Sequence, residues 1–195
     1  MRLPRPGRMP RSPRGWIAVA AALLAAFVIV LSRLGTTPPL LSADVPHTVT
    51  SVFDGDTVQL DGQFKVRLIG IDTMDSYSQD KVRRQAEELG MGEPTVRRWS
   101  KKATDRAKQL LKGESVRIEF GPERVDDYGR TLAYVHVRHD GEELLFNRLM
   151  IVEGLATATR KWPHLHREEF LKLEMGARAE QIGLWKDAHP RTPDY

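Results

Sequence analysis

The chain has 195 residues with 30 basic and 26 acidic side chains, and it contains no cysteine, which excludes disulfides, thiolate zinc sites and cysteine nucleophiles. The formal charge of +4 arises at the N-terminus, where residues 1–44 hold six arginines and one acid, whereas residues 45–195 hold 24 basic and 25 acidic side chains. Net charge is therefore no argument for a polyanionic partner, and any affinity for phosphate must come from local clusters.

The N-terminal residues have the pattern of an export signal. Five arginines precede a run of 16 apolar residues from Trp16 to Leu31, an order typical of a secretory signal or a signal anchor. We predict a basic segment (1–15), a transmembrane or signal-anchor helix (16–32) and a linker (33–46). An uncleaved anchor is favoured over a cleaved signal because no good cleavage site follows directly. In either case the remaining chain is expected outside the cytoplasm, membrane-anchored or secreted.

The next part of the chain predicts short strands. Residues 48–53, 57–60 and 64–71 are rich in Val, Ile, Phe and Thr, which favours strands. They are separated by Asp54-Gly55-Asp56 and by Asp61-Gly62, and Asp-Gly pairs between such segments are typical of hairpins.

A helical region follows. Residues 79–89 are highly charged and end at Gly90, which predicts a short surface helix, with an insertion as the alternative. Residues 94–111 predict a longer helix, because apolar residues recur at helical spacing before Gly113. Further strands are predicted over 115–120 and 131–137, and further helices over 146–153 and 164–181.

Short strands with interspersed helices predict a small closed sheet. We expect an α+β fold that is mainly a β-barrel, a five-stranded Greek-key OB-fold with about three packed helices, preceded by the N-terminal helix. The barrel domain is predicted to span residues 47–187, with a C-terminal tail over 188–195.

Polar residues gather near the ends of the predicted strands: Asp54, Asp56, Asp72, Thr73, Asp75 and Arg130. Arg67 lies within the strand predicted over 64–71, five residues before Asp72. Loops at one rim of a barrel are a common place for functional groups. Carboxylates suit Ca²⁺ or Mg²⁺, and an arginine presents a planar fork to phosphate oxygens. Each residue also has an ordinary alternative, as a turn carboxylate or a surface arginine. Their combination suits a hard cation beside a phosphodiester.

Three motifs in this order resemble the staphylococcal-nuclease-like (thermonuclease) family: Asp54-Gly-Asp-Thr57, Arg67-x4-Asp72-Thr73 and Asp126-x-Tyr128-Gly-Arg130. The resemblance covers about residues 48–186. It implies an OB-fold nuclease that uses one Ca²⁺ ion to hydrolyse phosphodiester bonds of DNA or RNA with low sequence specificity. We expect a monomer that prefers single-stranded substrates.

The resemblance also implies a role for each matching residue. Asp56, Asp72 and the Thr73 carbonyl would bind the ion, with Asp54 behind them. Arg67 and Arg130 would hold the scissile phosphate and stabilise the charge that grows on its oxygens.

Two aromatic residues are candidates for substrate binding. Tyr128 would hydrogen-bond a phosphate, with a packed turn aromatic as the alternative. Trp162 would stack on a base, with a half-buried aromatic at the start of a helix as the alternative.

The candidate base departs from the family. The family has Pro-Glu where this chain has Met74-Asp75, and the family's glutamate acts on the attacking water. Asp75 is one methylene shorter, and a misplacement of about 1 Å can cost about 10²-fold in rate. Asp127 adds a negative charge where the family commonly has a basic residue. These departures support the rival interpretation, a catalytically weak or inactive OB-fold module that binds nucleic acid or a protein.

Overall fold

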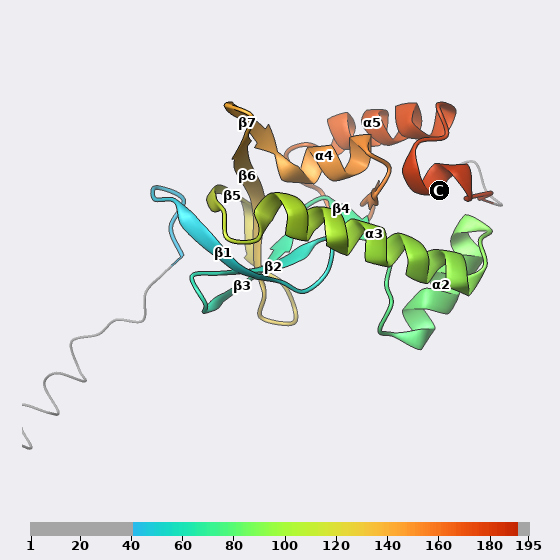
Figure 1. Ribbon diagram of the computed structural model, residues 1–195, viewed down its shortest axis with the longest axis horizontal. Helices are drawn as coiled ribbons and strands as arrows, with labels where there is room; N and C mark the ends of the chain where they lie inside the picture. Colours follow the sequence, from blue (N-terminus) through green and yellow to red (C-terminus); the bar gives the residue numbers. More distant parts are fainter. Residues whose placement is uncertain (1–40, 191–195) are drawn as a thin grey trace, which may run out of the picture. The chain divides into compact units, whose positions relative to one another are not determined.

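The computed structural model describes residues 41–190. Five strands form a closed barrel in the order β3-β2-β1-β5-β6, and a parallel pairing of β3 with β6 closes it (Figure 1). A further strand, β7, continues the sheet beyond β6. The bounds are β1 His47–Val52, β2 Thr57–Leu60, β3 Phe64–Leu68, β5 Ser115–Val125, β6 Thr131–His139 and β7 Glu142–Leu145.

Four α-helices accompany the barrel in the described residues, one more than the three or so that we expected. They are α2 Gln79–Leu89, α3 Glu93–Leu111, α4 Phe146–Val152 and α5 Arg167–Ala179, followed by the 3₁₀ helix η1 Gly183–Lys186. The segment 79–89 is a helix and not an irregular insertion. The terminal helix begins three residues later than predicted, so Trp162 lies in a loop and not at a helix start. The α+β barrel itself is confirmed.

Two Asp-Gly pairs make the tight hairpins of the barrel. Asp61 and Gly62 join β2 to β3 with φ values of 52° and 72°, and Asp140 and Gly141 join β6 to β7 with φ values of 51° and 85°. Positive φ at both central positions favours Asp and Gly and matches the right-handed twist of the paired strands. The predicted hairpin at Asp61-Gly62 is confirmed.

The strand predicted over 64–71 is interrupted at Gly70. This residue has a φ of 80°, and it separates β3 from the short strand β4, Ile71–Thr73. A Cβ at Gly70 would lie 2.5 Å from Cε1 of His164, so a larger residue would clash as well as strain the backbone. Beyond Gly70 the chain leaves the barrel, and β4 pairs antiparallel with β8, Ala156–Ala158.

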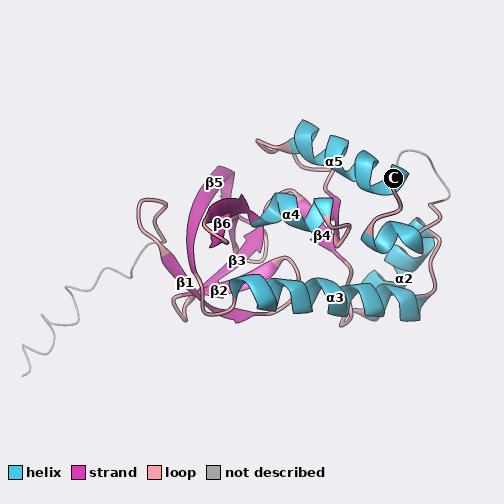
Figure 2. Cartoon of the chain, turned by 45° about the horizontal axis from the view of Figure 1, so that its top comes forward, coloured by secondary structure: helices cyan, strands magenta, loops and turns pink. Residues whose placement is uncertain are grey.

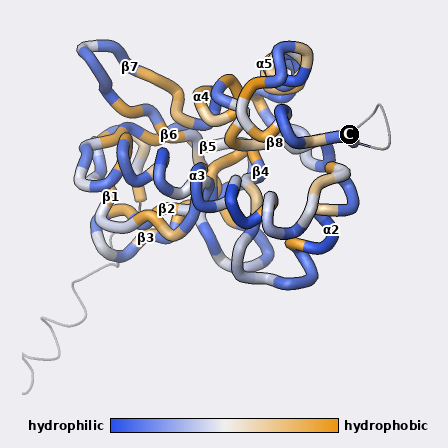
Figure 3. Tube along the Cα trace, turned by 45° about the vertical axis from the view of Figure 1, so that its right-hand side comes forward, coloured by the Kyte–Doolittle hydropathy of each residue, from blue (hydrophilic) through white to orange (hydrophobic). Residues whose placement is uncertain are grey.

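Apolar side chains from the strands fill the barrel, and α3 packs against β1 and β6. The five residues that recur at helical spacing in α3 are all buried: Val96, Trp99, Ala103, Ala107 and Leu110. Figure 2 shows α2 beside the N-terminal half of α3. In Figure 3 the hydrophobic colour follows the strands, and the loops between them are mostly hydrophilic. The barrel and α3 together form a rigid support for the loops at one end.

Within the described part of the chain, no helix is long and apolar enough to cross a membrane. The transmembrane or signal-anchor helix predicted for residues 16–32 lies outside the described residues, as does the basic segment predicted for residues 1–15.

Candidate active site

The ends of three strands bring the candidate residues together. The antiparallel pairing of β2 with β3 places Thr57 opposite Arg67, so Asp56 lies next to Arg67. The turn at Gly70 then carries β4 back, and the β4–β8 pairing holds Asp72 opposite Thr157. The Thr157 hydroxyl also donates to the Asp72 carbonyl at 3.1 Å. Asp56 from the turn before β2, Arg67 from β3 and Asp72 from β4 therefore meet at one place.

Arg67 is the centre of this cluster. Its Nη1 lies 2.7 Å from Asp56 Oδ1 and its Nη2 lies 2.9 Å from Asp72 Oδ1, with 14% of its side chain exposed. The alternative of an outward-facing surface arginine is therefore wrong. Burial lowers the pKa of Arg67, but the charges of Asp56 and Asp72 outweigh this effect and raise it above its usual value. The guanidinium is a fixed positive charge between two carboxylates.

The Asp56 carboxylate accepts three hydrogen bonds from two threonines. Its Oδ2 accepts hydrogen bonds from the amide and the hydroxyl of Thr73, both at 2.7 Å, and its Oδ1 accepts from the Thr57 hydroxyl at 3.1 Å. Burial raises the pKa of Asp56, but the charges of Arg67 and Lys81 and the bonds from Thr73 lower it overall. Asp56 is consequently ionised and fixed in orientation.

Asp54 lies behind Asp56. Its Oδ1 accepts from the Asp56 amide at 3.1 Å. Burial and the neighbouring charge of Asp56 raise the pKa of Asp54 to about 6. Asp54 therefore takes up a proton more readily than an exposed aspartate does.

Asp72 and Thr73 are joined to helix α2 by two residues that the sequence reading did not single out. Lys81 Nζ lies 3.2 Å from Asp72 Oδ1. The Gln85 amide group donates to Asp72 Oδ2 at 3.3 Å and to the Thr73 carbonyl at 3.2 Å. Burial lowers the pKa of Lys81, but the charges of Asp72 and Asp56 outweigh it and raise the pKa.

A signal for Gln85 was present in the sequence. The buried residues of α2 are Val82, Gln85, Ala86 and Leu89. This is the i, i+3, i+4, i+7 pattern of a core-facing stripe, and Gln85 is the polar residue within it. A buried amide needs partners, so Gln85 pointed to a polar neighbour under α2. Lys81 precedes Gln85 by one helical turn.

Asp75 is engaged by its own loop. Its Oδ1 accepts hydrogen bonds from the amides of Tyr77 at 2.7 Å and Ser78 at 2.8 Å, and its own amide donates to Gln85 at 2.8 Å. Its Oδ2 lies 3.7 Å from Lys81 Nζ. One carboxylate oxygen therefore forms the turn before α2, and the other faces the ammonium of Lys81.

Arg130 and Tyr128 lie in a separate turn. Arg130 Nε and Nη2 contact Asp126 Oδ2 at 2.7 and 2.6 Å, and Asp126 Oδ1 accepts from the Tyr128 and Arg130 amides. The charge of Asp126 contributes to the raised pKa of Arg67, so this turn is near the cluster. Tyr128 is 85% exposed, so it is not a packed turn aromatic. No direct contact joins Arg130 to Arg67 within the described residues.

Trp162 lies outside the cluster, in the loop before α5. It is 55% exposed, with Lys161 Nζ 4.9 Å from its ring centroid. The loop is anchored at both ends. Arg160 Nη2 contacts the fully buried Glu174 at 2.7 Å, and the Tyr134 hydroxyl lies 3.1 Å from His164 Nδ1.

Replacing Glu174 with Gln is expected to lower the free energy of unfolding by about 2–3 kcal/mol, because the buried carboxylate pairs with both Arg160 and Arg178. Urea unfolding of the variant measures this loss. Glu169→Gln is the matched control, since the Glu169–Arg148 pair is 43% and 50% exposed and should change stability by about 0.5 kcal/mol or less. Equal stability of the two variants would contradict the anchoring role.

The cluster suits a divalent cation in charge and in ligand chemistry. Four carboxylates (Asp54, Asp56, Asp72 and Asp75) surround two cations (Arg67 and Lys81), an excess of two negative charges. The potential ligands are all oxygens, which Ca²⁺ and Mg²⁺ prefer. However, residues 41–190 contain no ready group of three or more His, Cys, Asp or Glu that could hold a metal ion. An ion would share oxygens that Arg67 and Lys81 now contact.

Known proteins resemble the chain over most of its length. The profile of the family described as "Staphylococcal nuclease homologue" matches residues 65–187. The chain is 29% identical to a thermonuclease of Staphylococcus hyicus over 92% of this chain and 100% of the relative. It is 33% identical to a thermonuclease of Staphylococcus intermedius over 72% and 76%, respectively. An uncharacterized endonuclease of Escherichia coli O157:H7 is 30% identical over 80% of this chain and 86% of its own length.

Proposed function

Because the chain belongs to the staphylococcal nuclease homologue family, we propose that it is a nuclease that hydrolyses phosphodiester bonds of DNA or RNA with the help of a calcium ion. The observation that carries the proposal is the meeting of Asp56 and Asp72 on the two branches of one part-buried guanidinium, Arg67. A fixed cation held between two carboxyl groups is costly to desolvate. Such an arrangement is suited to a ligand that carries both a metal ion and a phosphate.

Each residue of the cluster has a proposed role. Asp56, Asp72 and the Thr73 carbonyl hold the ion, and Thr73 also fixes Asp56 through its amide and hydroxyl. When bound there, the ion supplies positive charge beside the phosphate oxygens. Arg67 stabilises the charge that grows on those oxygens without having to move into place.

Two further groups complete the proposed mechanism. Arg130 exchanges part of its pairing with Asp126 for the substrate phosphate, since a guanidinium has five N–H donors and Asp126 accepts from only some of them. Asp75 takes the proton of the attacking water on Oδ2, because Oδ1 already accepts from two amides.

The proposed substrate is single-stranded and is read with little sequence preference. Tyr128 and Trp162 are both largely exposed aromatic side chains, and each has a cation near its ring, Arg130 for Tyr128 and Lys161 for Trp162. The aromatic face of Trp162 stacks on any base, and Tyr128 hydrogen-bonds a phosphate. We propose that the domain acts outside the cytoplasm, on the basis of the arginine-rich and apolar order of residues 1–32. We also propose that it is a monomer.

A cleavage assay with the full chain tests the proposal. A labelled single-stranded DNA is incubated with Ca²⁺, with excess chelator, and with chelator followed by excess Ca²⁺. Cleavage is expected in the first and third reactions and not in the second. Asp72→Asn should need a higher Ca²⁺ concentration, because a metal ligand loses its charge.

Two outcomes would count against the proposal. Cleavage that persists in chelator would exclude the calcium requirement. Binding of the DNA without cleavage at any Ca²⁺ concentration would instead support the rival OB-fold binding module.

A further inference from the structure

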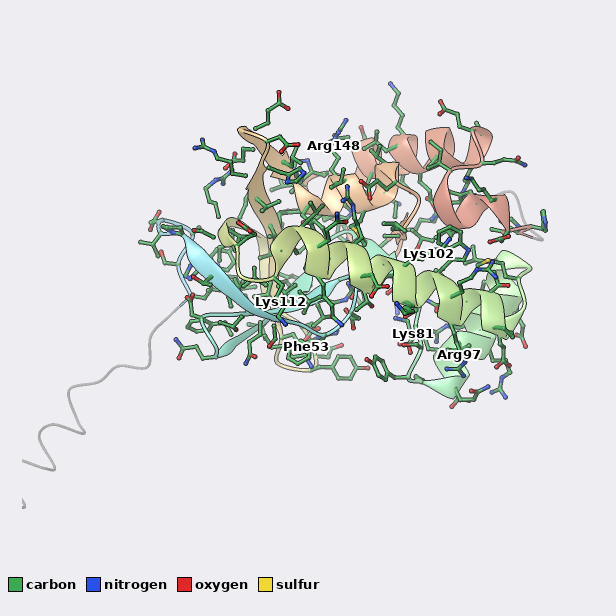
Figure 4. All side chains as sticks on the ribbon, in the orientation of Figure 1. Phe53, Lys81, Arg97, Lys102, Lys112 and Arg148 are labelled. Carbon is green, nitrogen blue, oxygen red and sulfur yellow. The ribbon has the colours of Figure 1, made fainter. Side chains whose placement is uncertain are left out.

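Lys81 occupies the position from which a cation can contact two carboxylates of the site. Its ammonium lies 3.2 Å from Asp72 Oδ1 and 3.7 Å from Asp75 Oδ2. The residue is in the first turn of α2, whose start is capped by the Ser78 side chain. The Asp75 carboxylate forms the turn that leads into this helix. Figure 4 labels Lys81 between Phe53 and Arg97 in that view.

Lys81 and Arg67 share one oxygen. Asp72 Oδ1 accepts from Arg67 Nη2 at 2.9 Å and from Lys81 Nζ at 3.2 Å, whereas Asp72 Oδ2 accepts from the Gln85 amide group at the longer distance of 3.3 Å. Arg67 is 14% exposed and is also held by Asp56, while Lys81 is 29% exposed and sits on a flexible stem. Lys81 is therefore the cation that can move away from Asp72.

We propose that Lys81 is an internal counter-ion that competes with the divalent cation for Asp72, and so sets the calcium concentration at which the site fills. The inference rests on the proposed function, because it takes Asp72 as a ligand of that ion. A bound dication and an ammonium within a few ångströms repel each other, and the repulsion acts directly on affinity. Lys81 must leave Asp72 when the ion binds.

The rival explanation is that the ion pair between Lys81 and Asp72 is purely structural and only holds α2 against β4. The two explanations predict opposite effects on calcium binding. If Lys81 competes, removing its charge tightens binding. If it only positions Asp72, removing it loosens the loop, and binding weakens or stays unchanged.

Calorimetric titration of Ca²⁺ into the full chain distinguishes them. Lys81→Met keeps most of the stem and removes the charge, and it is expected to bind Ca²⁺ about 10-fold more tightly than the wild type. Lys81→Gln is a second neutral variant with the same expectation, and Lys81→Arg should retain the wild-type affinity. Arg84→Met is the matched control: it removes one charge from the same helix at a side chain that is 63% exposed, and it should change the affinity by about twofold or less.

The outcomes separate this inference from the proposed function. Tighter binding in both neutral variants, including binding where the wild type shows none, supports the competition. Wild-type binding together with unchanged or weaker binding in both neutral variants overturns the competition and leaves the calcium-dependent nuclease intact. Absence of calcium binding in all the variants overturns both. Thermal unfolding with and without Ca²⁺ provides a second readout, because a ligand that binds only the folded state raises its stability.

Discussion

Replacing Arg67 with lysine is expected to slow phosphodiester cleavage by about 10²–10³-fold. The guanidinium spans two carboxylates, with Nη1 on Asp56 and Nη2 on Asp72, and it keeps further N–H donors for a phosphate. A lysine ammonium is a compact charge without the planar fork, so it cannot place one nitrogen on Asp56 and a second on Asp72. Lysine is preferred to alanine in this experiment, because alanine would leave the buried Asp56 without a cation and destabilise the fold.

The rate is measured as kcat/KM on a single-stranded DNA, with the melting temperature recorded for each variant. Arg117→Lys is the matched control. Arg117 also forms a two-armed pair, with Glu143 at 3.1 and 3.0 Å, but it lies on the exposed outside of β5. The control should cleave at the wild-type rate. Wild-type cleavage by Arg67→Lys would show that the fork has no part in catalysis.

Replacing Asp75 with asparagine is expected to slow cleavage by about 10²–10⁴-fold with little change in melting temperature. Asparagine keeps an Oδ1 that accepts from the Tyr77 and Ser78 amides, so the turn before α2 is preserved. It removes the negative charge at Oδ2, the oxygen proposed to take the proton of water. The rate is measured as kcat/KM on the same single-stranded DNA.

Asp80→Asn is the control, since Asp80 is 87% exposed and pairs with Arg83 at 2.8 Å on the surface of α2. If Asp75→Asn cleaves as fast as this control, Asp75 is a turn residue only. Asp75→Glu introduces the glutamate that the family has at this position, but it is a poorer probe of the base. The extra methylene shifts the carboxylate that accepts from the Tyr77 and Ser78 amides, so this variant changes the loop as well as the base.

The regular elements could be predicted because their causes are local. Asp61-Gly62 forms a hairpin through the backbone preferences of those two residues. The apolar positions of α3, such as Trp99 and Ala103, follow the period of one helix. The strands predicted over 115–120 and 131–137 also follow from local residue preferences, and the structure extends them to Val125 and His139. The β4–β8 pairing was missed because two three-residue strands carry too little pattern and depend on a partner 85 residues away.

The sequence predicted which residues form the site, but not which of their side chains contact one another. Asp56, Arg67, Asp72 and Thr73 stood out through their motifs, and the structure brings these four together, while their catalytic and metal-binding roles stay predictions. Lys81 and Gln85 were missed, because the motif order says nothing about which face of α2 turns toward β4.

The sequence by itself determined the residue types available for chemistry and the turns and helices that carry them. It also showed that the net positive charge lies in residues 1–44. Only the tertiary structure decided which charges meet. It turned Arg67 inward, paired Arg130 with Asp126, bent Asp75 into its own turn and placed Lys81 on Asp72. The physical reason is the difference in range between local and tertiary interactions. Backbone preferences act over a few residues, whereas the energy of an ion pair depends on a separation in space that packing alone sets.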